Sequence, residues 1–149
     1  MNPIHIPFAE GKSVNVIGNA ITIRLHGRDT GGALSVIESI DKPDEGPPPH
    51  IHHREDETFQ IIEGEYEFSC GGQAFKATKG ATIFAPRGVP HAYRCVGRNP
   101  GRMVVTITPA GFEEFFDEVG RLSPQEQAIP RVMEIADRYG LEFLPPVSS

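Results

Sequence analysis

The sequence predicts an all-β domain, a sandwich or barrel of antiparallel strands followed by a short helical tail. Apolar residues recur at every second position in many short segments, and Gly, Pro, Asn or Asp separates one segment from the next. After Thr108 the apolar period lengthens to that of a helix. We therefore expect residues 1–149 to form a single domain, with the β-barrel at about residues 20–108.

The strands are predicted from segments in which one face is apolar and the other is polar. In residues 65–70, Tyr66, Phe68 and Cys70 alternate with two glutamates and a serine, as in an antiparallel strand with one buried side. The expected strands are residues 20–26, 34–40, 50–53, 58–63, 66–70, 74–77, 82–85, 91–96 and 103–108. Side chains expected in the core between them are Phe59, Ile61, Phe68, Phe75 and Phe84.

The tail, residues 111–141, carries helical periodicity. The stripe of a first helix, ending near Gly120, is formed by Phe112, Phe115, Phe116 and Val119. Ser123 and Glu126 have capping-box spacing, which predicts a second helix that Pro130 keeps to a turn or two. The stripe of a third helix is formed by Val132, Ile135, Ala136 and Tyr139, before a stop at Gly140. We expect these helices to pack on the outside or over one mouth of the β-barrel.

Composition excludes several classes of partner. The formal net charge is −6 and no Lys/Arg-rich run occurs, so neither nucleic acid nor an anionic membrane surface is an expected partner. The first residues lack the pattern of a signal peptide, and no apolar run is long enough to span a membrane, so we expect a cytoplasmic protein. Two isolated cysteines, Cys70 and Cys95, are too few for a disulfide framework and are expected to be reduced.

Chemistry is suggested first by the stretch PPPHIHHREDE. Alternate residues of a strand share a face, so His50 and His52 project together while His53 points away. Glu57 can join them only if the chain bends across residues 53–56. Two imidazoles and a carboxylate suit a divalent first-row metal ion. Glu55 is expected to be solvated, although its parity with Glu57 makes it the alternative ligand.

A fourth candidate ligand lies far along the chain. Residues 80–95 predict a strand, a Pro-Arg-Gly turn and a second strand that opens with His91. Tyr93 and Cys95 share a face with His91, so both are candidates for a cavity wall, together with Phe59. The alternatives are a buried tyrosine with a satisfied hydroxyl and a cysteine that acts as a small buried apolar residue.

At these residues the chain resembles the cupin superfamily. His50-x-His52, four residues, Glu57, six residues and Gly64 match its first motif, and Gly80, five residues, Pro86-x-Gly88, two residues and His91 match its second. The chain looks like the single-domain cupins of the quercetin 2,3-dioxygenase-like type. This resemblance implies an antiparallel jelly-roll barrel, or double-stranded β-helix, and makes His50, His52, Glu57 and His91 the metal ligands.

Two positions depart from the family pattern. The glycine of the first motif stands five residues before its first histidine, whereas only three prolines separate Gly46 from His50. The asparagine that closes the second motif is replaced by Cys95. The first departure affects a loop, and the second removes any contact inferred from that asparagine.

The resemblance implies a metal-dependent oxidoreductase. Three histidines and a carboxylate leave one or two positions open on an octahedral ion, as in a catalytic site. Fe, Mn, Ni, Cu and Zn all suit these donors, and a chelating small-molecule substrate would give its proton to Glu57. A binding or sensing cupin and a metal-dependent isomerase or decarboxylase are the alternatives, as is a barrel that holds no metal.

The resemblance also implies a homodimer. N-terminal strands of related cupins pair across a two-fold axis, and short strands in an open barrel leave edges to be covered. Residues Ile4 to Ile21 are the segment expected at that interface.

Overall fold

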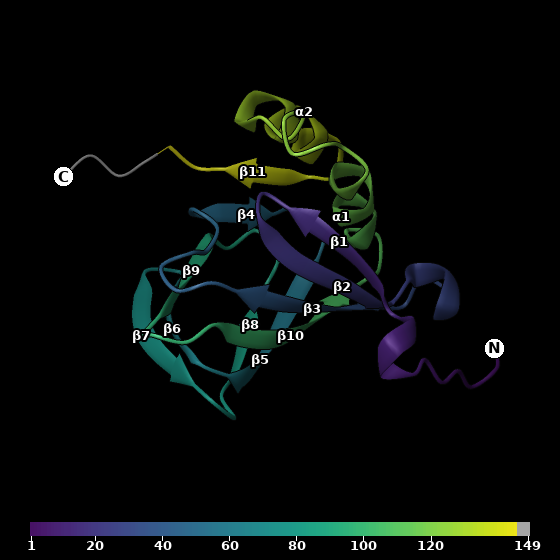
Figure 1. Cartoon of the computed structure of the whole chain (residues 1–149), viewed down its shortest axis with the longest axis horizontal. Helices are drawn as coiled ribbons and strands as arrows, with labels where there is room; N and C mark the ends of the chain where they lie inside the picture. Colours follow the sequence, from purple (N-terminus) through teal and green to yellow (C-terminus); the bar gives the residue numbers. More distant parts are fainter. Residues whose placement is uncertain (146–149) are drawn as a thin grey trace.

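Two antiparallel sheets enclose the core in a computed structural model that describes residues 1–145 (Figure 1). The first sheet has the order β1-β2-β3-β10-β5-β8, and the second has the order β11-β4-β9-β6-β7. The strands are β1 (Lys12–Val16), β2 (Asn19–Leu25), β3 (Ser35–Asp41), β4 (His50–His52), β5 (Asp56–Glu63), β6 (Glu65–Cys70), β7 (Gln73–Thr78), β8 (Thr82–Ala85), β9 (His91–Val96), β10 (Gly101–Thr108) and β11 (Leu141–Phe143). The expected all-β jelly-roll barrel with a helical tail is confirmed.

The central strand β10 shows how the sequence specifies the barrel. Met103, Val105 and Ile107 are buried and alternate with half-buried residues, so one face of β10 points into the core. β10 pairs with β3 on one side and with β5 on the other. Slipping either pairing by one residue would turn three apolar side chains outward, so burial fixes the register.

Two of the expected core aromatics lie at the surface instead. Phe75 is on the edge strand β7 and Phe84 is on the edge strand β8, and they are 37% and 58% exposed. In β8 the buried face belongs to Ile83 and Ala85. Because Ile83 and Phe84 are both apolar neighbours, alternation alone could not decide which of them faces inward.

The tail packs over the open side of the barrel, between β1 and β11 (Figure 1). It contains α1 (Glu113–Gly120) and α2 (Ile129–Arg138). Ser123 and Glu126 exchange the hydrogen bonds of a capping box, but only a turn follows them. The expected short helix is therefore wrong. Pro130 lies in the first turn of α2, where its missing N–H costs no helical hydrogen bond, so it begins a helix instead of ending one.

The strand β11 was not expected from the sequence. It follows Gly140, whose φ of +72° reverses the chain after α2, and it pairs with β4 so that Phe143 lies opposite His50 and Leu141 lies opposite His52. Three residues are too few to show a strand period. β11 thus covers the edge of the strand that carries two candidate ligands.

Within residues 1–145, no helix is long and apolar enough to cross a membrane.

Candidate metal centre

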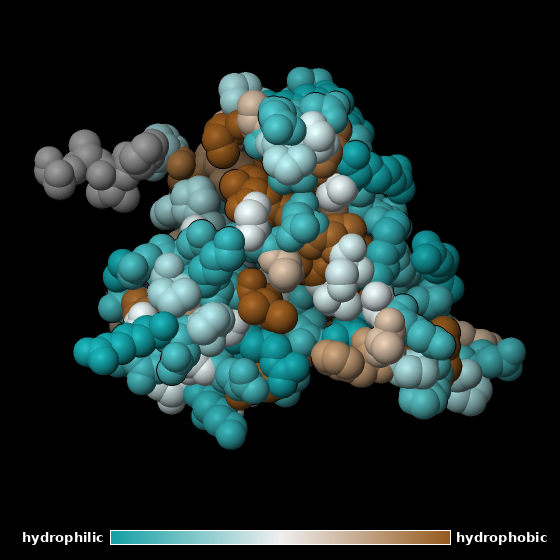
Figure 2. Space-filling view, viewed as in Figure 1, coloured by the Kyte–Doolittle hydropathy of each residue, from teal (hydrophilic) through white to brown (hydrophobic). Residues whose placement is uncertain are grey.

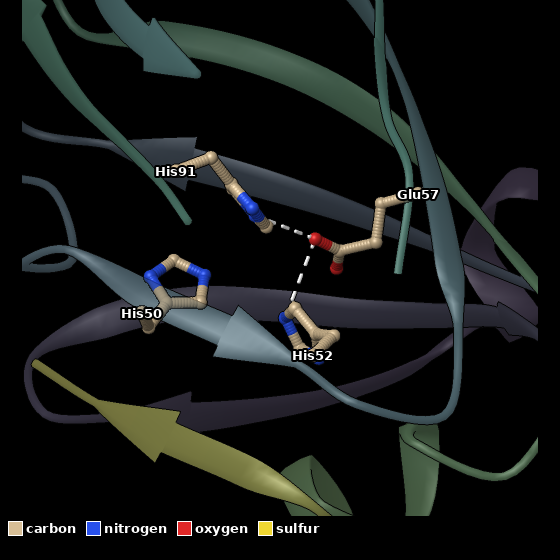
Figure 3. A group of neighbouring side chains, drawn as sticks. All are labelled: His50, His52, Glu57 and His91. Carbon is tan, nitrogen blue, oxygen red and sulfur yellow. Dashed lines mark hydrogen bonds and ion pairs between the residues drawn. The ribbon is translucent and has the colours of Figure 1, made fainter. Parts of the chain in front are cut away.

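Four side chains converge between the two sheets (Figure 3). His50 and His52 come from β4 and His91 from β9, all in the second sheet, whereas Glu57 comes from β5 in the first. Each is at most 5% exposed, and one possible ligand atom of each lies within 4.8 Å of the others. The structure therefore brings together all four residues that the two sequence motifs predicted as ligands.

Local structure explains the convergence. His50 and His52 point inward from β4 while Ile51 does not, and His50 is paired directly with His91 on β9. The chain bends at residues 53–54, as expected, and enters β5. Glu57 then faces the histidines from the opposite sheet. His53 points away and meets Glu142 at the surface, with 3.1 Å between Nε2 and Oε1.

Two hydrogen bonds orient the imidazoles. His50 Nδ1 lies 2.8 Å from the carbonyl oxygen of Pro48, and His91 Nδ1 lies 3.3 Å from that of Val89. A carbonyl oxygen only accepts, so the Nδ1 atom of His50 carries the hydrogen and its Nε2 keeps a lone pair. Nε2 of His91 and Nε2 of His52 lie 2.9 Å and 3.3 Å from Glu57 Oε2.

The electrostatics favour the protonation states that bind a cation. Burial, together with the neighbouring His91 and His52, lowers the pKa of His50 from 6.5 to about 4. Burial also lowers the pKa of His52. Burial alone would raise the pKa of Glu57, but His52 and the hydrogen bond with His91 lower it overall. Neutral imidazoles beside an ionised carboxylate fit a divalent transition ion.

The pKa of His50 predicts that the metal-free protein loses stability in acid. The unfolded chain takes up a proton near pH 6.5, whereas folded His50 does so near pH 4. This contribution is complete above pH 6.5 and is lost as the pH falls towards 4, and it amounts to roughly 3 kcal/mol at 1.36 kcal/mol per pKa unit. Urea denaturation with a chelator should therefore show a steeper loss for the wild type than for His50→Gln.

Comparing the wild type with His50→Gln isolates the contribution of His50 to the pH dependence of stability. Glu55 has a raised pKa and acts in the opposite direction, but it is common to both proteins and cancels. Parallel pH profiles for the two proteins would contradict the prediction.

A second group of possible ligands lies where α1 meets the end of β2. His26, Glu114 and Asp117 have ligand atoms within 4.8 Å of one another. The ammonium of Lys12 contacts Asp117, however, and an Arg121 nitrogen lies 3.8 Å from the same carboxylate. Both cations already pair with Asp117, so the group between the sheets is the better candidate for a metal.

A cavity of about 250 Å³ is lined by three of the four candidate ligands, His50, His52 and Glu57. Phe59 and Tyr93 line it, as predicted, and so do Phe112 and Phe115 from the tail. Ile17 and Ile129 line it too and are 46% and 56% exposed, which places its opening between the β1–β2 turn and the start of α2. Figure 2 shows hydrophobic side chains on this face, over β11 and around β1.

Cys95 does not belong to the cavity wall. It shares the inward face of β9 with Tyr93, but it lies opposite Tyr66, is fully buried, and its thiol is 3.7 Å from the carbonyl oxygen of Asn99. Burial raises the pKa of its thiol. The expectation that Cys95 lines the pocket is wrong, because the barrel is filled at this level by the core.

Polar residues that sequence reasoning missed line the same cavity. Ser39 and Asp41 are buried inward-facing residues of β3, and Asp41 accepts hydrogen bonds from Ser39 Oγ at 2.9 Å and from Tyr66 Oη at 2.7 Å. Asn19 also lines the cavity, and its buried Oδ1 has no partner among the described residues. Polar residues at the inward positions of a predicted strand were the signal that could have revealed Ser39 and Asp41.

Replacing Tyr66 with phenylalanine is expected to lower the free energy of unfolding by about 1–3 kcal/mol, because it leaves a buried carboxylate oxygen of Asp41 without its donor. Urea denaturation measures this loss. Tyr139→Phe is the matched control, because that hydroxyl donates to Glu118 nearer the surface. An equal loss in both variants would show that the hydrogen bond to Asp41 contributes no more to stability than the bond to Glu118.

Glu55 is buried, contrary to the expectation that it is solvated. It is 4% exposed, and burial, followed by the charge of Glu57, raises the pKa of its carboxyl to about 7. It is not one of the four convergent residues. Glu55 is buried as Glu57 is, so the parity that the two residues share was the signal for its inward position.

The fold and the cluster together define a small β-barrel protein with a candidate site for one metal ion. Residues 38–107 match the family model described as "Cupin domain", so this part of the chain is a cupin domain of the cupin superfamily. The superfamily resemblance is thereby confirmed, whereas the quercetin dioxygenase-like subtype stays a prediction. A comparison with curated proteins gave no significant match.

Solved structures share the fold. KdgF from a Halomonas species aligns with a TM-score of 0.67 and 17% identity, over 76% of this chain and 99% of KdgF. An RmlC-like cupin from Shewanella frigidimarina aligns at 0.65 and 16%, over 76% and 96%. A predicted oxalate decarboxylase from Thermotoga maritima aligns at 0.61 and 18%, over 71% and 99%. At these identities the likeness concerns the fold alone.

Proposed function

We propose that this protein is a metal-dependent oxidoreductase of the dioxygenase type, acting on a small organic substrate with adjacent oxygen atoms. The observation that carries the proposal is the convergence of three buried histidines and a glutamate beside a mostly apolar cavity, whose wall includes His50, His52 and Glu57. Such a donor set leaves one or two positions of an octahedral ion open to a ligand. Family resemblance supports the choice of dioxygenase among the reactions that this fold hosts.

Each residue of the cluster has a defined role in this proposal. His50, His52, His91 and Glu57 would hold the ion. A divalent Fe, Mn, Ni or Cu ion bound there would polarise a chelating oxygen of the substrate and lower the pKa of that group. Glu57 is the one carboxylate of the cluster and lines the cavity, so it is placed to accept the proton that the substrate loses.

The rest of the cavity favours a small, partly aromatic substrate. Its volume of about 250 Å³ is below the ~300–1,000 Å³ typical of drug-sized sites. Phe59, Phe112 and Phe115 supply flat apolar walls, and Tyr93, Ser39 and Asp41 supply polar groups. We therefore propose catechols, flavonols and 1,3-diketones as the first compounds to test.

The test begins with elemental analysis of protein purified without added metal. An oxygen electrode then measures oxygen consumption with each compound, before and after removal of the metal by a chelator. The proposal expects oxygen uptake that requires both substrate and a redox-active ion. Full turnover without metal, or the absence of any bound transition ion, would overturn it.

Other outcomes identify the alternative functions. Substrate turnover without oxygen would indicate an isomerase or a decarboxylase. Thermal stabilisation by a ligand, with Zn(II) as effective as redox-active ions and no turnover, would indicate a binding or sensing protein.

We also propose that the protein is a homodimer. Strand β1 stands at the edge of the first sheet, within the segment expected at the interface. Light scattering tests this proposal, and a monomer would contradict it without bearing on the metal centre.

A further inference from the structure

One of the three clustered histidines lacks the orienting contact that the other two have. Nδ1 of His50 and Nδ1 of His91 each face a backbone carbonyl oxygen. Nδ1 of His52 is buried and has no hydrogen-bond partner among residues 1–145. The nearest acidic group is Glu55, whose Oε1 lies 3.9 Å away and is likewise buried without a partner within the described part of the chain.

The residues around Glu55 are held by contacts to other elements. Arg54 donates from Nη1 to the carbonyl oxygen of Arg138, the last residue of α2, at 3.1 Å. Asp56 accepts from the backbone N–H of Arg87 at 2.9 Å. The bend is therefore fixed on both sides of Glu55. The buried Glu55 carboxyl between these contacts therefore lies beside His52, and its Oε1 atom has no hydrogen-bond partner within the described residues.

Glu55 is not itself placed to be a ligand. Its Oε1 atom approaches His52 from the Nδ1 side of the ring, whereas Glu57 approaches from the Nε2 side, 3.3 Å away. The two carboxylates thus flank one imidazole. The alternative in which Glu55 replaces Glu57 as the ligand does not agree with this arrangement.

We propose that Glu55 is a positioning residue for the metal centre, accepting the Nδ1–H of His52 so that Nε2 of His52 faces the ion. The inference rests on the proposed function, because it requires a metal in the cluster. Histidine ligands nearly always donate their second ring N–H to a carboxylate or a carbonyl, which fixes the tautomer and the ring orientation. The observed 3.9 Å is about 1 Å longer than a charge-assisted hydrogen bond, so a small rotation of either side chain closes it.

Glu55→Leu is expected to affect metal affinity and metal-free stability differently. The metal affinity is expected to fall by about 10–100-fold, as for other outer partners of metal ligands. The thermal stability of the metal-free protein is expected to stay the same or to rise, because a buried polar group without a partner is removed. If Glu55 had only a structural role, its replacement would lower both the metal affinity and the metal-free stability.

The experiment compares Glu55→Leu with two further variants. Glu55→Gln keeps an acceptor oxygen and is expected to lose less affinity than Glu55→Leu. Glu142→Gln alters the matching histidine–glutamate contact at the surface, to His53, and is expected to bind metal as the wild type does. Chelator competition gives the affinity for Co(II). The visible spectrum of the Co(II) protein should change in Glu55→Leu and stay unchanged in Glu142→Gln, because only the former frees a ligand ring.

The outcomes separate this inference from the proposed function. A wild type that binds no transition ion would refute both. A wild type that binds Co(II), with Glu55→Leu equal to it in affinity and spectrum, would refute only the role of Glu55. Loss of affinity in step with loss of metal-free stability would also refute that role and assign Glu55 to the fold.

Discussion

Replacing His91 with alanine is expected to reduce the affinity for a transition ion by more than the roughly 10–100-fold that an outer partner costs, and to abolish metal-dependent turnover. His91 is the ligand that completes the cluster from the neighbouring strand, with its ring centroid 4.3 Å from that of His50 and its Nε2 atom 2.9 Å from Glu57 Oε2. Its loss removes a donor and a partner of the buried carboxylate at once. Elemental analysis after dialysis and chelator competition measure the effect.

His53→Ala is the matched control for His91→Ala. His53 stands next to His52 in the sequence, but its side chain is 50% exposed and contacts Glu142 at the surface. The control should therefore keep the wild-type metal content. A His91→Ala protein that retained one tightly bound ion per chain would remove the basis of the proposed centre.

Replacing Gly46 with alanine is expected to lower the free energy of unfolding by about 3 kcal/mol, the upper part of the range for overpacking. A Cβ atom at this position would lie 1.9 Å from the backbone oxygen of Tyr93. The loop cannot move aside cheaply, because hydrogen bonds join Asp44 N to Cys95 O at 2.8 Å and Cys95 N to Glu45 O at 2.9 Å. Urea denaturation measures the loss.

Gly72→Ala serves as the control for Gly46→Ala. Gly72 has no neighbouring atom within 4 Å of an added Cβ, but its φ of +84° imposes a cost of about 1 kcal/mol on alanine. The loss at Gly46 should exceed this cost clearly. Metal affinity should fall as well, because the loop leads through three prolines to His50. Equal losses in the two variants would show that the close approach to Tyr93 is tolerated.

The fold class and the convergence of four residues could be predicted from the sequence because both depend on local patterns. Strand parity places His50 with His52, and motif spacing adds Glu57 and His91. The burial of Glu55 was not predicted, although Glu55 shares parity with Glu57 and both are buried. Strand parity also does not tell how deep in the barrel an inward residue lies, so it groups Cys95 with Tyr93 although Cys95 belongs to the closed core.

Long-range pairing accounts for what could not be predicted in the tail and at the edges. β11 has three residues, and its only sign was a glycine suited to a helix end. Whether Phe84 is covered depends on what lies beside β8, which the segment itself does not encode. A proline such as Pro130 can either end a helix or occupy its first turn, and the segment alone does not distinguish the two. Such choices are made by tertiary packing.

Because β11 is hydrogen-bonded to β4, the strand that bears His50 and His52 gains its outer neighbour only when residues 141–143 have been synthesised. His50 and His52 are therefore synthesised well before β11, the strand that pairs with theirs. Metal loading is therefore expected to follow synthesis of residues 141–143, and a ribosome-bound chain stalled before Leu141 should capture ions less well than the full chain.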